Sequence, residues 1–236
     1  MSSVNYEYPN GETIKVTIET TLLTPKTFLP YGKLWEHESL KKFFSYIDDN
    51  NHTIVDIGAQ TGLYTLYAKW LPSCSFYAFE PFEDSYRCLK DNIKLNDIKN
   101  VYTLPVAISD KTGTAILNTC IHHNGLHTMG DKPLRFTDVK PVKVNTITLN
   151  DMFSHTRVDF IKIDTEGYEY YILKGGVNVI KRDQPLIQIE YHEKNMKQCN
   201  VNPDEFMRFI KDVLGYHVVS HIKEEMIIAP INLKFS

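Results

Sequence analysis

The central part of the chain alternates between short apolar stretches and segments whose apolar residues recur at helical spacing. The stretches "TIVDIG" (53–58), "SFYAFE" (75–80) and "NVYTLPVAIS" (100–109) predict strands. Between them, residues 63–71 and 84–96 predict helices. Strands and helices in this order form a parallel sheet joined by right-handed crossovers. This alternation constrains the fold most strongly, because it predicts an α/β domain.

Residues 110–148 interrupt the alternation. Two short expected strands, "GTAILNTC" and "PVKVNTITL", stand on either side of a long polar loop. The pattern then resumes with a strand over 158–164, a helix over 168–180 and a strand over 185–192. Long polar connections inside an α/β domain are often functional. We therefore expect a β-rich insertion in an otherwise regular sheet.

A further helix is expected over 202–216, because its boundary signals are complete. Asn202 is suited to the N-cap, Pro203 to the first helical position and Gly215 to the position past the end. The stretches "YHVVSH" and "EEMIIAP" follow this helix and predict a hairpin that completes the sheet.

The first 50 residues differ from the rest, with one expected strand over 13–23 and one helix over 36–47. We interpret residues 1–50 as an N-terminal cap and residues 51–236 as the main domain. The expected fold is a doubly wound, Rossmann-like α/β domain with a mostly parallel seven-stranded sheet.

Composition and charge limit the classes of partner that we expect the protein to bind. The chain has 236 residues and a net charge of -3, so we expect no long-range attraction to nucleic acid or to an anionic membrane. No apolar stretch approaches the ~20 residues of a membrane span. Residues 1–4 lack the basic start and apolar core of a secretion signal, so we expect none. The cysteines are scattered, as reduced thiols in a cytoplasmic protein would be: Cys74, Cys88, Cys120 and Cys199.

A glycine-containing loop, "VDIGAQTG", follows the first strand of the alternation. Gly58 and Gly62 allow a sharp turn and a close approach to a ligand at the carboxyl ends of the strands. The first glycine of a dinucleotide-binding GxGxxG would fall at Asp56, and no phosphate-binding GK[ST] follows. An ordinary strand-to-helix turn is the plainer interpretation of the loop alone.

Glu80 ends the next strand, in "YAFEP", 22 residues after Gly58. A carboxylate at that position can accept hydrogen bonds from the two hydroxyls of a ribose. A solvated or capping carboxylate is the alternative. Together, the loop and the acid favour a cofactor that contains a nucleoside without a pyrophosphate.

Three carboxylates follow the strand over 158–164, in "IDTEGYE". Asp164 ends the strand, Glu166 precedes Gly167, and Glu169 begins the next helix. The pattern fits a turn, a metal site or a cofactor site. We expect Asp164 to meet the cofactor cleft, Gly167 to permit the tight exit and Glu169 to favour the helix start through the helix dipole.

The chain closely resembles the FkbM-type S-adenosylmethionine-dependent methyltransferases over residues 28–193. The resemblance rests on "VDIGAQTGLYT", "FYAFEP", "VAISD", "ITLNDMF", "VDFIKIDTEGYEYYILKGG" and "PLIQIEYH". It implies the class I methyltransferase fold, S-adenosylmethionine as the cofactor, and methyl transfer to a hydroxyl of a small molecule, most often a sugar or glycan. A cationic sulfonium fits a cleft lined by carboxylates.

The resemblance also implies a role for each part of the cleft. Asp56 and the loop of Gly58, Ala59, Thr61 and Gly62 would surround the methionine part of the cofactor. Glu80, with Pro81 after it, would hold the ribose, and Val106, Ala107 and Ile108 would border the adenine. Asp164 would lie near the transferred methyl group. Trp35, in "GKLWE", stands where the family often has a tyrosine.

A sugar hydroxyl is a poor nucleophile, so a general base is expected. The candidates are Asp164, Glu190 and His192. Some sugar methyltransferases use a divalent ion at this sheet edge, which Asp164 and Glu190 could bind.

For the acceptor, we expect contacts from Glu166, His127 and Trp35. His127 shares a loop with His122 and His123, which could bind metal or form a solvated lid.

The alternatives are a nucleic-acid methyltransferase, a methyltransferase-fold protein that acts on a non-sugar natural product, an NAD-linked oxidoreductase and a non-catalytic binding module that kept the fold. Base methyltransferases commonly carry [DNS]-P-P-[YF] where this chain has "DTEG". An NAD-linked oxidoreductase would need the absent GxGxxG. Small-molecule O-methylation remains the leading hypothesis.

Overall fold

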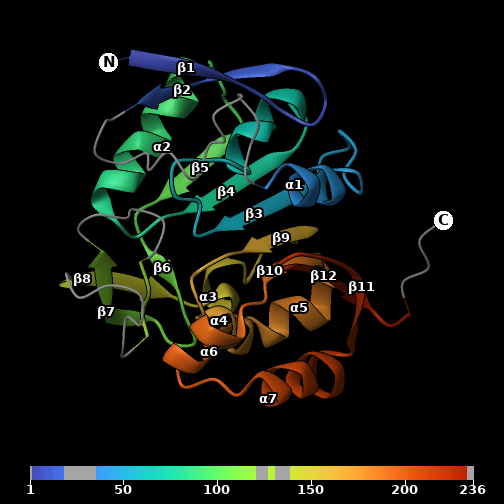
Figure 1. Ribbon diagram of the computed structural model, residues 1–236. Coiled ribbons are helices and arrows are strands. Elements are labelled where there is room, and N and C mark those ends of the chain that lie inside the picture. The colour runs from blue at the N-terminus through green and yellow to red at the C-terminus, as the bar shows by residue number, and fades with distance from the viewer. Residues whose placement is uncertain (1, 19–35, 121–126, 131–138, 233–236) are drawn as a thin grey trace.

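A computed structural model describes residues 2–18, 36–120, 127–130 and 139–232. Figure 1 shows its main feature, a seven-stranded sheet. The strand order is β11 (Tyr216–Ile222), β12 (Glu225–Pro230), β10 (Leu186–Glu190), β9 (Phe160–Ile163), β3 (Thr53–Ile57), β4 (Ser75–Phe79) and β5 (Val101–Leu104).

The five strands from β10 to β5 are parallel, and β12 runs antiparallel to both β10 and β11. The mostly parallel sheet, its C-terminal hairpin and the expected class of fold are confirmed. The order reverses between β3 and β9, so the crossovers leave this pair in opposite directions. In open α/β sheets, ligands bind outside the strand ends at such a switch point.

Both faces of the sheet are covered, as a parallel sheet requires. Ile54 packs in an apolar cluster with α1 (His37–Phe44) and the 3-10 helix η1 (Thr65–Trp70). Val55 and Ile57 point the other way. Their cluster includes residues of the following helices: α3 (Leu149–Met152), α4 (Glu169–Gly175), α5 (Val177–Asp183), α6 (Glu193–Gln198), α7 (Pro203–Arg208) and the π-helix η2 (Phe209–Leu214).

Helix α2 (Glu83–Leu95) follows β4 and lies close to the N-terminal hairpin of β1 (Ser2–Glu7) and β2 (Thr13–Ile18). The sequence predicted only the second of these strands. The hairpin continues into the buried Tyr8, whose hydroxyl donates a hydrogen bond to the carbonyl of Leu63 at 2.8 Å. The N-terminal segment thus shares an apolar core with the sheet.

The strand predicted over 100–109 is wrong in extent. Main-sheet pairing ends at Leu104, since Pro105 has no N–H to continue the ladder. The short strand β6 (Ala107–Ile108) instead pairs in a three-stranded sheet with β8 (Val139–Ile147) and β7 (Gly113–Cys120). This second sheet is the expected β-rich insertion.

One helix prediction also needs correction, and one helix was missed. The segment 63–71 forms a 3-10 helix over Thr65–Trp70, and helix α6 was not predicted. Within the described ranges, no helix is long and apolar enough to cross a membrane.

Candidate active site

The residues singled out in the sequence lie largely at one edge of the main sheet. They come at or directly after the carboxyl ends of four parallel strands. These positions are the loop after β3, Glu80 after β4, Asp164 after β9 and Glu190 at the end of β10. Backbone hydrogen bonds fasten the β3 loop to its neighbour: the N–H groups of Gly58 and Ala59 both donate to the Phe79 carbonyl, at 3.0 and 3.1 Å. The topology therefore brings distant segments to one site.

The glycines of the β3 loop are required by its backbone. Gly58 has a φ of 75°, and a Cβ there would lie 1.9 Å from the carbonyl oxygen of Asp164. Gly62 has a φ of 103°, and a Cβ there would lie 2.8 Å from Leu89 Cδ1. Both positions suit a residue without a side chain. The Asp164 N–H donates to the Ile57 carbonyl at 3.1 Å, so the turns after β3 and β9 pack directly together.

Glu80 joins the β3 loop to the start of α2. Its Oε2 accepts a hydrogen bond from the Gln60 N–H at 2.9 Å, and its Oε1 accepts one from the Phe82 N–H at 2.8 Å. Burial raises the pKa of Glu80 to about 7, although these two hydrogen bonds favour the charged form. Each carboxylate oxygen retains capacity for another donor. Pro81 separates Glu80 from the α2 N-terminus.

Asp56 lies beneath the loop, on β3, and only 2% of it is exposed. Its Oδ2 accepts a hydrogen bond from Thr65 Oγ1 at 2.6 Å, and its Oδ1 lies 3.8 Å from Lys162 Nζ. Burial raises its pKa, while Lys162 and Thr65 act in the opposite direction. Asp56 thus connects the loop to the strand behind it.

The adenine-bordering residues expected from the resemblance, Val106, Ala107 and Ile108, lie at the start of the insertion. Ala107 is buried in a small apolar cluster with Leu117 and Val144, against which Phe82 packs. Ala107 therefore adjoins the segment after Glu80. Ala107 and Ile108 pair in the second sheet, while Ile108 and Val106 pack with the main core.

The turn after β9 is organised by Glu169. Glu169 Oε1 accepts hydrogen bonds from the Thr165 N–H and hydroxyl, at 2.8 and 2.9 Å, and from the Gly167 N–H at 3.3 Å. Glu169 does begin α4, but it is buried and burial raises its pKa to about 7. We expected Glu169 to favour the helix start through the helix dipole. Its hydrogen bonds are instead with the preceding turn, which its carboxyl group organises.

Positive φ angles shape the same turn: 56° at Glu166 and 103° at Gly167. A Cβ on Gly167 would lie 2.2 Å from the Asn195 carbonyl oxygen, which explains the glycine. Glu166 Oε2 accepts a hydrogen bond from Asn195 Nδ2 at 2.7 Å. Helix α6, which the sequence analysis missed, therefore holds Glu166 in place.

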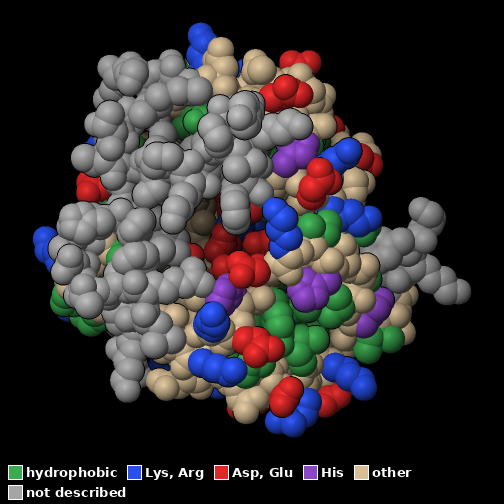
Figure 2. All heavy atoms as spheres, in the orientation of Figure 1, with side chains coloured by type: hydrophobic (Ala, Val, Ile, Leu, Met, Phe, Trp, Pro, Cys, Tyr) green, Lys and Arg blue, Asp and Glu red, His purple; other side chains and the backbone are tan. Residues whose placement is uncertain are grey.

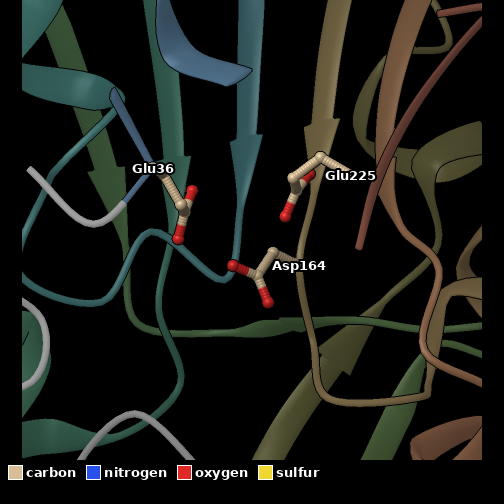
Figure 3. A group of neighbouring side chains, drawn as sticks. All are labelled: Glu36, Asp164 and Glu225. Atoms are coloured by element: carbon tan, nitrogen blue, oxygen red, sulfur yellow. The ribbon is translucent and has the colours of Figure 1, made fainter. Parts of the chain in front are cut away.

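Acidic side chains gather around Asp164. Its carboxylate lies with those of Glu166 and Glu190 in one triad, and with those of Glu36 and Glu225 in another. Within each triad the ligand oxygens are within 4.8 Å of one another. Figure 3 shows the second triad converging from three elements, and acidic side chains lie near the middle of the face in Figure 2.

Charge repulsion and burial act together on this cluster. Burial, followed by repulsion from Asp164, raises the pKa of Glu36 to about 7. Burial and the neighbouring carboxylates raise the pKa of Glu190 well above its usual range, and Glu225 is affected in the same direction. The carboxylate of Asp164 is about a quarter exposed. Asp164 is thus a partly exposed carboxylate that belongs to both triads.

A family model described as the methyltransferase FkbM domain matches residues 56–218, more than half of the chain. The chain belongs to this family. Methyltransferase sdnD of Sordaria araneosa is 29% identical, in a match that covers 53% of this chain and 61% of that protein. The match thus spans less than two-thirds of that relative's length.

Solved structures support the fold of this FkbM-family protein. Methyltransferase FkbM from Methylobacillus flagellatus KT has a TM-score of 0.53 at 13% identity, over 89% of this chain and 48% of that one. The P. horikoshii TYW2 structure in complex with MeSAdo has a TM-score of 0.51 at 13% identity, over 96% of this chain and 69% of that one. At such identities the likeness shows the fold alone, which is the class I methyltransferase fold.

Two histidines predicted to act in this FkbM-family site have structural contacts. His192 is the N-cap of α6: its Nδ1 accepts a hydrogen bond from the Asn195 N–H at 3.4 Å, and its Nε2 lies 3.1 Å from Glu224 Oε1. His127 Nδ1 accepts from the Cys120 N–H at 3.2 Å, and its ring packs against Phe82 with the ring centres 4.3 Å apart. Burial lowers the pKa of His127 to about 4, so its ring is neutral near pH 7.

Trp35, His122 and His123 lie outside the described residues. Three residues near Asp164 were not among the predicted site residues: Lys162, Glu36 and Glu225. Lys162 had a usable signal, since it interrupts the apolar strand "FIKI". Glu36 ends the stretch "GKLWE", but nothing there or around Glu225 indicated that the two would approach Asp164, because their approach depends on the packing of three distant elements.

Proposed function

We propose that the protein is an S-adenosylmethionine-dependent O-methyltransferase that acts on a hydroxyl of a small polyhydroxylated molecule, a sugar or a glycan. The family assignment supports methyl transfer. The observation that carries the proposal is the position of Asp164: a partly exposed carboxylate at the switch point of the sheet, whose backbone contacts the β3 loop. That position suits an acceptor hydroxyl beside the cofactor.

The cofactor half of the proposal rests on the β3 loop and Glu80. Glu80 would accept hydrogen bonds from the ribose hydroxyls, and the Gly58–Gly62 turn would border the methionine part. Val106, Ala107 and Ile108 would border the adenine. When bound, S-adenosylmethionine supplies a methyl group already activated on a sulfonium. The protein then mainly needs to align the acceptor oxygen, and alignment of this kind can contribute ~7–11 kcal/mol.

The acceptor half rests on Asp164 with Glu166 and Glu190. Asp164 would accept the proton of the attacking hydroxyl, and Glu166 would accept a hydrogen bond from a second hydroxyl. Burial and the neighbouring carboxylates raise the pKa of Glu190, which favours the protonated form that can donate a hydrogen bond. His192 is a weaker candidate for the base, because both of its ring nitrogens have contacts.

A divalent cation is the second cofactor to test. Asp164, Glu166 and Glu190 offer the oxygen ligands that Mg²⁺ and Ca²⁺ prefer, and Glu190 Oε2 is buried without a hydrogen-bond partner among the described residues. The triad with Glu36 and Glu225 fits less well, because the Lys162 ammonium lies beside it.

The experiment is methyl transfer from labelled S-adenosylmethionine to a panel of free and nucleotide-linked sugars, with RNA and DNA as further acceptors, each with and without EDTA. We expect transfer to a sugar hydroxyl, lowered by ~10²–10⁴-fold but still measurable in Asp164→Asn, and retained in Asp212→Asn, an exposed aspartate far along the chain. Transfer to nucleic acid but to no sugar contradicts the acceptor class. Loss of activity in EDTA, restored by Mg²⁺, supports the cation.

A further inference from the structure

Lys162 is a buried lysine in the centre of the parallel sheet. It lies on β9 between Asp56 of β3 and Gln188 of β10, which are its register partners, and 4% of it is exposed. Strands buried on both faces are normally apolar throughout. A lysine in this place, with its desolvation cost, calls for a specific set of partners.

The partners of the Lys162 ammonium come from both turns of the cleft. Nζ donates to the carbonyl of Gly58 at 3.4 Å and to Asp164 Oδ2 at 3.3 Å. It also lies 3.8 Å from Asp56 Oδ1 and 5.0 Å from the centre of the Tyr64 ring. One cation therefore links the loop after β3 to the turn after β9.

The surrounding charges keep this group ionised. Burial alone would lower the pKa of Lys162, but Asp164, Asp56, Glu36 and Glu225 together raise it above its usual range. These acids come from the turn after β9, from β3, from the segment before α1 and from β12. The ammonium is therefore a fixed positive charge within an acidic cluster.

We propose that Lys162 is a positioning residue, which holds the Asp164 carboxylate and the Gly58 carbonyl at a fixed separation across the join of β3 and β9. This inference rests on the proposed function, in which Asp164 faces the acceptor and the Gly58 turn borders the cofactor. An ammonium suits the task because its three donors can point to several acceptors at once. Without it, Asp164 would turn away from its neighbouring carboxylates and toward solvent.

The test is a double-mutant cycle on Lys162→Met and Asp164→Asn. It measures kcat and KM for the best acceptor and the Kd of S-adenosylhomocysteine, at a temperature where every variant is folded. Lys162→Met alone is expected to lower kcat by ~10²-fold, the usual effect of a misplacement of about 1 Å. In the Asp164→Asn background, Lys162→Met should lower kcat less than ~3-fold, because the carboxylate that Lys162 positions is no longer present. Equal losses in both backgrounds overturn the proposal.

Two further variants exclude a purely structural effect. Lys174→Met is the matched control, since Lys174 is exposed and also lies over a tyrosine ring, at 5.2 Å from its centre; it should behave as wild type. Lys162→Arg keeps the charge but fixes the donors in a plane. It should fold even if Lys162→Met does not, and should lower kcat while leaving KM for the cofactor within ~3-fold. An unchanged kcat in Lys162→Arg also overturns the proposal.

Failure of the proposed function would look different. A wild-type protein that binds no S-adenosylhomocysteine, or that methylates no acceptor, contradicts that function. If the wild type binds S-adenosylhomocysteine but methylates no acceptor, the affinity for this ligand tests the role of Lys162. Because Lys162 contacts Gly58, we expect Lys162→Met to bind it ~10-fold more weakly, which corresponds to about one hydrogen bond. Equal affinities in Lys162→Met and Lys174→Met overturn it.

Discussion

Replacement of Glu80 by alanine is expected to weaken cofactor binding strongly while the protein stays folded. Glu80 lies at the end of β4, where its two oxygens accept hydrogen bonds from the backbone N–H groups of Gln60 and Phe82. The substitution removes both contacts and the carboxylate that would face the ribose. Binding should suffer far more than folding, because both N–H groups adjoin a loop that water can reach once the side chain is gone.

The magnitude follows from the number of hydrogen bonds. A hydrogen bond to a charged group contributes ~1.5–3 kcal/mol, so two ribose hydroxyls correspond to ~3–6 kcal/mol. At about 1.4 kcal/mol for each factor of ten, the Kd of S-adenosylhomocysteine should rise by ~10²–10⁴-fold. Glu80→Gln should lose nearly as much, since its amide NH₂ group would face a backbone N–H.

Because the pKa of Glu80 is raised, the stability of the ligand-free protein should depend on pH in a defined direction. The carboxyl group titrates near pH 4.5 when unfolded and near pH 7 when folded, so between these values the folded protein binds more protons. Stability of the ligand-free protein should therefore fall as the pH rises from about 5 to 8, by on the order of 3 kcal/mol from this group. Urea unfolding of Glu80→Gln should show a smaller fall than wild type over the same range.

Calorimetry with S-adenosylhomocysteine at pH 8, where Glu80 is ionised, is the direct assay. Glu83→Ala is the matched control, because Glu83 is an exposed glutamate three residues further on. Glu80→Asp should bind weakly, since the shorter side chain cannot reach both N–H groups. Affinity in Glu80→Ala equal to that in Glu83→Ala would refute the ribose assignment.

Three other substitutions separate backbone geometry, capping and chemistry. Gly58→Ala should lower the Tm and weaken cofactor binding, because the new Cβ would lie 1.9 Å from the Asp164 carbonyl oxygen; a wild-type melting curve and Kd would contradict this. His192→Asn should keep most of the activity, since asparagine also caps helices; a ~10²-fold loss of kcat would instead identify His192 as the base. Asn202→Ala removes hydrogen bonds to the α7 N-terminus at 2.8 and 3.3 Å and should cost ~1 kcal/mol, a Tm decrease of ~2–4 °C, with kcat unchanged. A fall in kcat at constant Tm would contradict the capping role.

Local signals predicted the elements whose boundaries are set by local chemistry. The helix after Asn202 begins where its N-cap and Pro203 indicate, and Gly215 follows its end with a φ of 74°. The parallel sheet was predictable for the same reason, since the alternation of apolar runs and helical repeats is a property of neighbouring residues. The β3 loop and Glu80 were found by spacing alone, and the structure places them in direct contact.

What the sequence could not show depends on contacts between distant segments. Pro105 marks a strand boundary, but nothing nearby tells that Ala107 joins a second sheet. Glu225 approaches Asp164 because β12 inserts beside β10, a neighbour fixed only by the whole topology. Glu169 was predicted only to favour the start of the next helix, because its hydrogen-bond donors, the N–H groups of the preceding turn, become organised only when the turn folds around it.

A buried row of polar side chains lies next to the site, and it arises from the register of three strands. Each strand contributes a triplet of residues that is ordinary on its own. The strands β3, β9 and β10 contain "VDI" (55–57), "IKI" (161–163) and "IQI" (187–189), each with one polar residue between two apolar ones. In the sheet the outer residues align in apolar rows that point into one core, while the middle residues align as a polar row on the opposite face. Toward the amino ends of the strands, the neighbouring row on that face is apolar, with Ile54, Phe160 and Leu186. The face thus changes from apolar to charged toward the carboxyl edge, where Asp164 and the β3 loop meet. When parallel strands each contain a single polar residue between two apolar ones, the pattern therefore predicts a buried row of polar side chains next to the site. Lys162 could have been predicted from this pattern.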